Sequence, residues 1–145
     1  MDTNLNKTEN PPDVIAAKVE LGTRRTVKIA EITGIIPYGF YMARTPVVCD
    51  PAPFEIDQAL QAKTFESRGF QTHLKELEAE WANSASVQEY SLKVKNYHAQ
   101  RIAHFVYHGW AEPIALTAEK KITDGLHRLR AAIHKGLFEI EAMIS

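Results

Sequence analysis

The sequence predicts an α+β domain in which a small mixed sheet packs against helices. Short apolar or β-branched runs typical of strands occur near both ends of the chain, at residues 26–30, 113–117 and 122–123. Between them, residues 54–108 combine good helix formers with apolar side chains at helical spacing. A chain of 145 residues is long enough to bury a core without disulfides or metal ions, so we expect a single domain.

The composition is typical of a globular protein and excludes a strong basic field. Apolar residues make up 45% of the chain, charged residues make up 24%, and the formal net charge is −1. Such a chain would need a local basic patch to bind DNA. No apolar run approaches the roughly 18 residues needed to cross a bilayer, and the polar N-terminus has no signal-peptide core. Cys49 is the single cysteine, so we expect no internal disulfide, which fits a reducing cytoplasm. Together with the lack of a long apolar run and of a signal-peptide core, this predicts no membrane association and a cytoplasmic location.

The N-terminal third is expected to hold a polar lead-in, one strand and one irregular segment. Residues 1–13 have the composition of a disordered lead-in to a domain over residues 14–145, which opens with a short helix or strand at 14–20. Residues 31–53 contain repeated Gly and Pro, which predicts a functional loop or a crossing of the core. The aromatic residues of this segment are Tyr38, Phe40 and Tyr41. Such rings can stack on a base, but packing onto the core is their commoner use.

The middle of the chain is expected to form three helices, over residues 54–68, 72–82 and 86–108. The third helix opens with Ser86 and Glu89, which have the spacing of a capping box. We expect its apolar stripe to face inward. The stripe comprises Tyr90, Val94, Tyr97 and Phe105.

The C-terminal segment predicts a strand, a turn, a second strand, a glycine-opened helix and a last strand. Asp124 is placed to cap this helix, and Gly136 lies where a C′ glycine belongs. A glycine followed by His and Arg at a helix N-terminus supplies free backbone N–H groups, the positive end of the helix dipole and two cationic donors. Two interpretations stay open: an ordinary turn with solvated His127 and Arg128, or a phosphate site that needs Gly125 for close backbone approach.

Two segments, HAQRIAHFVYHGWAEPIALT and KITDGLHRLRAAIHKGLFEIEAMI, resemble the ParB/sulfiredoxin superfamily. In that family a helix leads to a glycine, a Pro-Ile strand, a G-x-H-R or G-x-R-R box that opens an Ala-rich helix, and a last strand. The resemblance covers about residues 86–145, and the strand at 26–31 corresponds to the family's first strand. It implies a ParB/sulfiredoxin-like fold in which the box holds nucleotide phosphates through Gly125, His127 and Arg128.

The resemblance also implies further site residues. Asp124 precedes the box, as in the kinase and the phage or plasmid nuclease branches, where an acidic residue at this point binds a metal ion or acts as a base. Glu31 is the position that aligns with the catalytic glutamate of the serine-kinase branch, with a solvated strand-end carboxylate as the alternative. His108 ends a helix that lies near the nucleotide pocket in the family fold. The implied ligands are a nucleoside triphosphate, ATP or CTP, and Mg²⁺.

The sequence also departs from the family pattern. Sulfiredoxins carry a cysteine where this chain has Leu126, and Cys49 lies in no matching motif, so a peroxiredoxin-repair activity is not expected. Partition proteins carry Arg in place of His127 and continue into a helix-turn-helix, whereas this sequence ends at Ser145. A complete partition clamp is therefore not expected.

Two other groups of residues have patterns found in binding sites. His104 and His108 have the i,i+4 spacing of a metal pair, but no third ligand is evident, which favours histidines at the surface or the core edge. Residues 23–25 with Lys28 form the densest basic cluster, which is either a contact for DNA or nucleotide phosphates or a solvated edge.

Two classes of function follow from these observations. One is an enzyme, a nucleotide-dependent phosphotransferase, nucleotide hydrolase or nuclease, in which Asp124 and Glu31 serve catalysis. The other is a non-catalytic, phage- or plasmid-type accessory module that binds a nucleotide or touches DNA without turnover. The family commonly forms homodimers, so a homodimer is an expected partner state.

Overall fold

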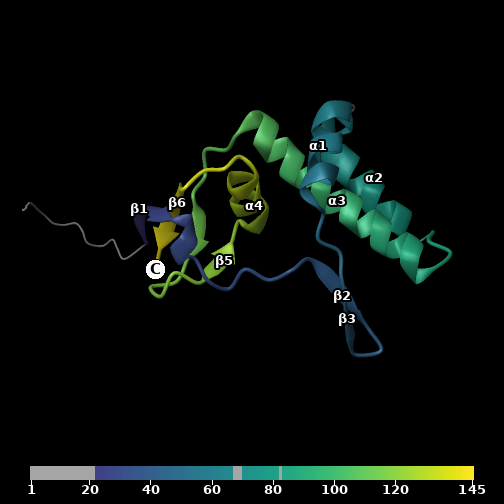
Figure 1. Ribbon diagram of the computed structural model, residues 1–145, viewed down its shortest axis with the longest axis horizontal. Coiled ribbons are helices and arrows are strands. Elements are labelled where there is room, and N and C mark those ends of the chain that lie inside the picture. The colour runs from purple at the N-terminus through teal and green to yellow at the C-terminus, as the bar shows by residue number, and fades with distance from the viewer. Residues whose placement is uncertain (1–21, 67–69, 82) are drawn as a thin grey trace, which may run out of the picture.

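The computed structural model describes residues 22–66, 70–81 and 83–145 (Figure 1). The expected lead-in at residues 1–13 and the short element at 14–20 lie outside the described residues. No helix in the described part of the chain is both long and apolar enough to cross a membrane.

A four-stranded mixed sheet forms one end of the molecule. Its strands are β1 (Thr23–Lys28), β4 (Ile114–Leu116), β5 (Ile122–Asp124) and β6 (Glu139–Ile144), in the order β1-β6-β4-β5. Strand β6 is antiparallel to β1 and parallel to β4, while β4 and β5 are antiparallel. The sheet therefore joins the first described strand to the last, and the predicted α+β class is confirmed.

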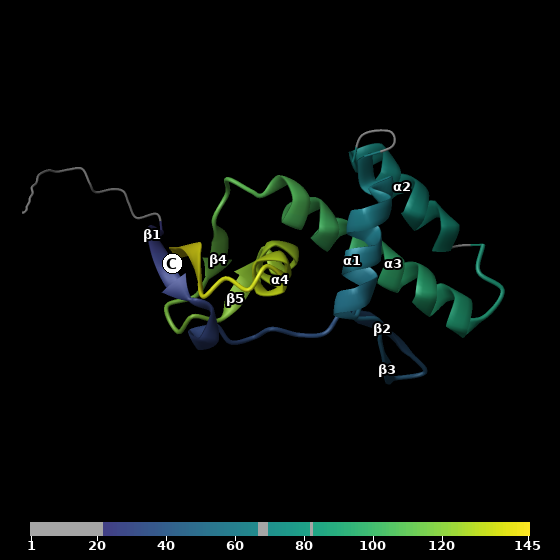
Figure 2. The ribbon, with the colours of Figure 1, turned by 45° about the horizontal axis from the view of Figure 1, so that its top comes forward.

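Helix α4 (Leu126–His134) lies between this sheet and the other helices (Figure 2). Its fully buried Leu129 packs with apolar side chains from all the neighbouring strands. These include Val27, Ile114, Leu116 and Ile140. Gly136 at φ +75° ends the helix, where Leu137 N–H donates to the Ala132 carbonyl at 3.0 Å, so the predicted C′ glycine is confirmed.

Three helices form the other end: α1 (Pro53–Ala62), α2 (Phe70–Trp81) and α3 (Val87–His108). The long helix α3 contacts α1, α2 and α4. Ser86 caps α3 as predicted, because its hydroxyl accepts from Glu89 N–H at 3.1 Å. The apolar stripe of α3 also faces inward, with Val94 and Tyr97 buried and with Tyr90 and Phe105 partly buried.

Two predictions about the first half of the chain were wrong. The segment at 31–53 is not irregular throughout, because it contains a hairpin of β2 (Gly39–Met42) and β3 (Thr45–Val48). Its two-residue turn places Ala43 and Arg44 at positive φ, without the Asn-Gly signal that would have revealed it. The helix expected to run to residue 68 ends at Ala62, because Lys63 adopts the left-handed conformation at φ 54°.

We predict that Leu129→Ala lowers the free energy of unfolding by about 2–5 kcal/mol, because it leaves a cavity in a fully packed core. Chemical denaturation monitored by circular dichroism measures this change. Ile133→Ala on the same helix is the control, because this side chain is 47% exposed and should change stability by less than about 1 kcal/mol. Equal losses for the two variants would contradict the assignment of the buried face.

Candidate functional site

The predicted strand-to-helix junction is present. Strand β5 ends at Asp124, Gly125 is the N-cap residue at φ +96°, and α4 begins at Leu126. A Cβ atom on Gly125 would lie 2.8 Å from Ile114 Cγ2 and 3.0 Å from Arg128 Nη2, so both the conformation and the space require glycine. No side chain caps α4, which leaves its first backbone N–H groups for solvent or a ligand.

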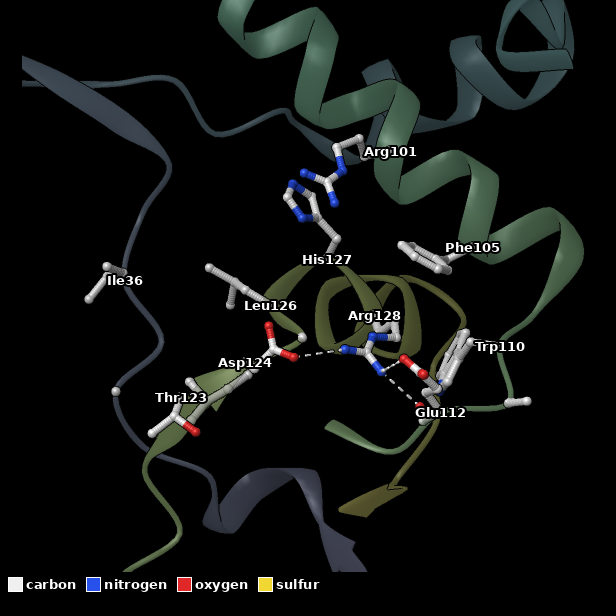
Figure 3. Close-up of a pocket in the computed structure, with 14 residues that line it drawn as sticks. Ile36, Arg101, Phe105, Trp110, Glu112, Thr123, Asp124, Leu126, His127 and Arg128 are labelled. Atoms are coloured by element: carbon white, nitrogen blue, oxygen red, sulfur yellow. Dashed lines mark hydrogen bonds and ion pairs between the residues drawn. The ribbon is translucent and has the colours of Figure 1, made fainter. Parts of the chain in front are cut away.

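A cavity of about 650 Å³ opens onto this helix end (Figure 3). Residues 124–128 form one side of it, and Arg101 and Phe105 of α3 form the opposite side. Trp110 and Glu112, from the segment before β4, and Ile36 complete much of the wall. The volume falls in the range of about 300–1,000 Å³ that is typical of small-molecule sites.

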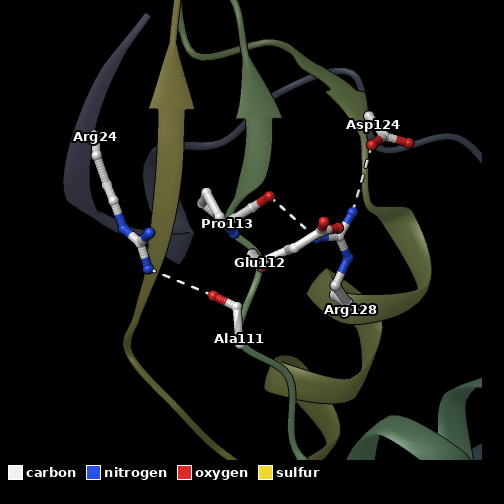
Figure 4. A network of polar contacts seen from close by, with 6 residues as sticks. All are labelled: Arg24, Ala111, Glu112, Pro113, Asp124 and Arg128. Atoms are coloured by element: carbon white, nitrogen blue, oxygen red, sulfur yellow. Dashed lines mark hydrogen bonds and ion pairs between the residues drawn. The ribbon is translucent and has the colours of Figure 1, made fainter.

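Arg128 lines the cavity but is largely occupied by the protein itself (Figure 4). Its Nη1 donates to the carbonyls of Glu112 at 2.9 Å and Pro113 at 3.0 Å, and its Nη2 donates to Asp124 Oδ2 at 3.4 Å. The side chain is only 12% exposed. Arg128 therefore fastens the start of α4 to the chain that enters β4.

Asp124 does not cap α4, so the predicted capping role was wrong. The carboxylate belongs to the last residue of β5 and faces the Arg128 guanidinium, while Gly125 takes the N-cap position. With a side chain that is 77% exposed, Asp124 presents its remaining oxygen positions to the mouth of the cavity.

His127 belongs to a stack of three rings. Its Nε2 lies 2.8 Å from His98 Nδ1 of α3, and the Tyr38 ring stacks on both imidazoles. The Tyr38 centroid is 3.9 Å from that of His98 and 4.8 Å from that of His127. Tyr38 thus packs into the core, the commoner of the two uses expected for it. A hydrogen bond between two imidazoles needs one donor and one acceptor nitrogen, which a pair of neutral rings provides.

The surroundings of this stack disfavour protonation of either histidine. Burial, reinforced by the positive charge of Arg101, lowers the pKa of His98 to about 4. Burial also lowers the pKa of His127 far below its usual value, with further contributions from Arg101, His98 and Arg130. The His127 ring is therefore a neutral hydrogen-bonding group at neutral pH, and it supplies no positive charge to the cavity.

Arg101 is a site residue that the sequence interpretation missed. It lies at helical spacing between Tyr97 and Phe105 of the apolar stripe of α3, which indicated an inward-facing position but gave no sign of a cavity. Figure 3 shows its guanidinium extending from α3 to the His127 ring. A cation inside an otherwise apolar stripe was the one signal that could have revealed it.

Two of the predicted site residues lie elsewhere. Glu31 does not line this cavity and instead pairs with Lys120 Nζ at 2.5 Å, an interaction that lowers the pKa of its carboxyl group. His108 ends α3 outside the cavity, with its Nε2 3.8 Å from Glu66 Oε2. The structure therefore brings Asp124, Gly125, His127 and Arg128 together and leaves Glu31 and His108 apart from them.

The other candidate sites also have definite positions. His104 and His108 lie with ring centroids 4.7 Å apart, but within the described residues no three His, Cys, Asp or Glu side chains are grouped to hold a metal ion. In the basic cluster of β1, Arg24 pairs with Glu141 across the sheet at 2.5 Å.

Comparison with protein-family models, with curated proteins and with solved structures found no match to this chain.

We predict that Gly125→Ala lowers the free energy of unfolding by about 2–4 kcal/mol, from backbone strain and the contact with Ile114 together. Gly136→Ala is the matched control, because Gly136 also has positive φ and ends the same helix, but its added Cβ meets nothing within 4 Å. The control should lose about 1–2 kcal/mol. Denaturant titration of the two variants measures the difference, and a control loss as large as that of Gly125→Ala would argue against the close approach.

We also predict that stability falls when the pH is lowered from 7 to 5. The folded-state pKa of both histidines in the stack lies below the usual value of about 6.5. The unfolded chain therefore takes up protons first, which weakens folding by up to about 2 kcal/mol for each histidine over this interval. The double variant His98→Gln/His127→Gln should show a smaller loss in denaturant titrations at the two pH values, whereas His108→Gln, at the exposed end of α3, should keep the wild-type difference. If the double variant loses as much stability between pH 7 and pH 5 as the wild type, the two histidines are not the cause of the loss.

Proposed function

We propose that this protein binds a nucleoside triphosphate, ATP or CTP, with its phosphates at the N-terminus of α4. The observation that carries the proposal is the cavity of about 650 Å³ that opens onto this uncapped helix end. Free N–H groups and the positive end of the helix dipole both favour an anion at that position.

The local sequence supports the same proposal. Gly125, His127 and Arg128 are the residues of the box that resembles the ParB/sulfiredoxin superfamily, and all three line the cavity. The order of strand, glycine-opened helix and last strand also agrees with that resemblance. We therefore propose a ParB/sulfiredoxin-like arrangement for this part of the chain.

The cavity offers surfaces for both parts of a nucleotide. Its polar groups are the first turn of α4 on one side and Arg101 on the opposite side, and Phe105 and Trp110 supply apolar surface. Aromatic side chains provide stacking surface and apolar contact for a nucleobase, while the helix end takes the phosphates. This division matches the usual composition of ligand sites, which are apolar with a few well-placed polar groups.

Asp124 is the candidate ligand for Mg²⁺. Mg²⁺ commonly binds through one or two carboxylates together with the phosphates of the substrate, so the absence of a preformed carboxylate cluster among the described residues is compatible with it. Asp124 suits this role because its exposed carboxylate lies at the mouth of the cavity, next to the proposed phosphate position. When bound, the ion would neutralise phosphate charge there.

We predict that isothermal titration calorimetry detects binding of ATP or CTP to the wild-type protein and that Mg²⁺ strengthens it. Asp124→Asn should remove the Mg²⁺ effect, because it replaces the charged metal ligand. Asp57→Asn is the control, since Asp57 is an exposed carboxylate of α1 that pairs with His134 and does not line the cavity. Failure of every nucleoside triphosphate to bind would reject the proposed function.

The same variant separates the enzyme from the binding module. An enzyme should release phosphate or transfer it, and Asp124→Asn should lose that turnover. A binding module should show no phosphate release above the rate of free nucleotide in either protein. Assays of phosphate release with both nucleotides decide between the two.

A further inference from the structure

The charges around the ring stack do not balance. The contributing groups are Arg101 and His98 on α3, Arg130 and His127 on α4, and Asp50 with Tyr38 from the hairpin and its flanks. Asp50 is already committed, because it accepts from Tyr38 N–H at 2.7 Å and lies 3.3 Å from Arg130 Nη1. Both imidazoles are neutral at neutral pH, so among these groups one arginine has no directly bonded carboxylate.

That arginine is Arg101. Its Nη1 donates to Tyr97 Oη at 3.3 Å, and that hydroxyl donates in turn to Glu78 Oε2 at 3.1 Å, so Glu78 reaches Arg101 only through Tyr97. The Nε atom of Arg101 is buried with no hydrogen-bond partner in the described part of the chain. Among residues 22–66, 70–81 and 83–145, no ion pair within 4 Å joins this guanidinium to a carboxylate. A partly buried cation without a direct ion pair is costly, and an anion that arrives with the ligand would offset part of that cost.

Arg128, the other arginine that lines the cavity, is bound by hydrogen bonds to the protein itself. Arg128 donates to two backbone carbonyls and to Asp124, so its donors are used in holding the start of α4. Arg101 lies on the facing wall with an unpartnered Nε donor and no direct ion pair among the described residues. A phosphate held between the first turn of α4 and α3 would meet Arg101 from the side opposite the helix end.

We propose that Arg101, rather than Arg128, is the side chain that binds the ligand's phosphate groups, and that it is kept without a direct ion pair in the ligand-free protein for this purpose. This assignment rests on the proposed function, because it names the partner of the same site. The ligand it selects is a polyanion, such as a triphosphate or pyrophosphate, whose charge can reach both the helix end and α3.

Calorimetric titration of ATP, CTP and inorganic pyrophosphate into Arg101→Gln and Arg101→Lys tests the assignment. Arg101→Gln should weaken binding by about ten- to hundredfold, the effect of losing a hydrogen bond to a charged group. Arg101→Lys should recover part of the loss, because it restores the charge without the forked geometry. Arg24→Gln is the control: it removes an equal charge from an arginine on β1 that lies outside the cavity, and it should keep the wild-type affinity.

Unfolding without ligand gives a second, independent readout. If Arg101 is kept for the ligand, Arg101→Gln should unfold at the same or a higher denaturant concentration, because the variant removes a partly buried cation that has no direct ion pair. A clear fall in stability with unchanged affinity would make Arg101 structural and overturn the assignment. Equal affinities of wild type and Arg101→Gln overturn it while leaving the nucleotide site in place, whereas no binding of any probe to wild type overturns both.

Discussion

The packing of α4 between two apolar cores is the constraint on which the rest of the structure depends. Leu129 and Ala132 belong to the core under the sheet, while the adjacent Ala131 belongs to the core that includes Tyr38 and Ile102. Neighbouring positions on one short helix therefore face different cores, and small side chains at these positions let both approach closely. Because the helix is held from both sides, its N-terminus has a fixed position.

The two arginines near that N-terminus illustrate how similar residues divide into different tasks. Arg128 completes the hydrogen bonding of two carbonyls that precede β4 and thereby orients the helix start. Arg101 contacts Tyr97 through a hydrogen bond to its hydroxyl and a cation–π contact with its ring, and it has no direct ion pair among the described residues. Proteins keep such groups where binding needs them, at some cost in stability.

Much of the fold could be predicted because it follows from local patterns. The cap at Ser86, the helical spacing of α3 and the glycine at 125 each act over a few residues, and the structure has all three. The β2–β3 hairpin escaped prediction because its turn uses Ala43 and Arg44, which carry no turn signal.

The site was predictable only in part, for a related reason. Gly125 and its neighbours are adjacent in the sequence, so their grouping in one cavity followed from the chain itself. The stacking of Tyr38 and His98 on His127 joins three distant segments, and no periodicity encodes it. Likewise, helical spacing placed Arg101 on the inner face of α3 but could not show that a cavity lies there.

The stacked rings of Tyr38, His98 and His127 connect the β2–β3 hairpin to the wall of the cavity. Tyr38 immediately precedes β2, and its ring lies against His127, which forms part of the cavity wall. Arg130 reinforces this connection, because it lies 4.7 Å above the Tyr38 ring and donates to the Ile36 carbonyl at 3.1 Å. Because the rings are in contact, the position of His127 in the cavity wall depends on the segment that enters the hairpin. The hairpin, which extends beyond the helices in Figure 1, is therefore joined to the cavity wall through this stack.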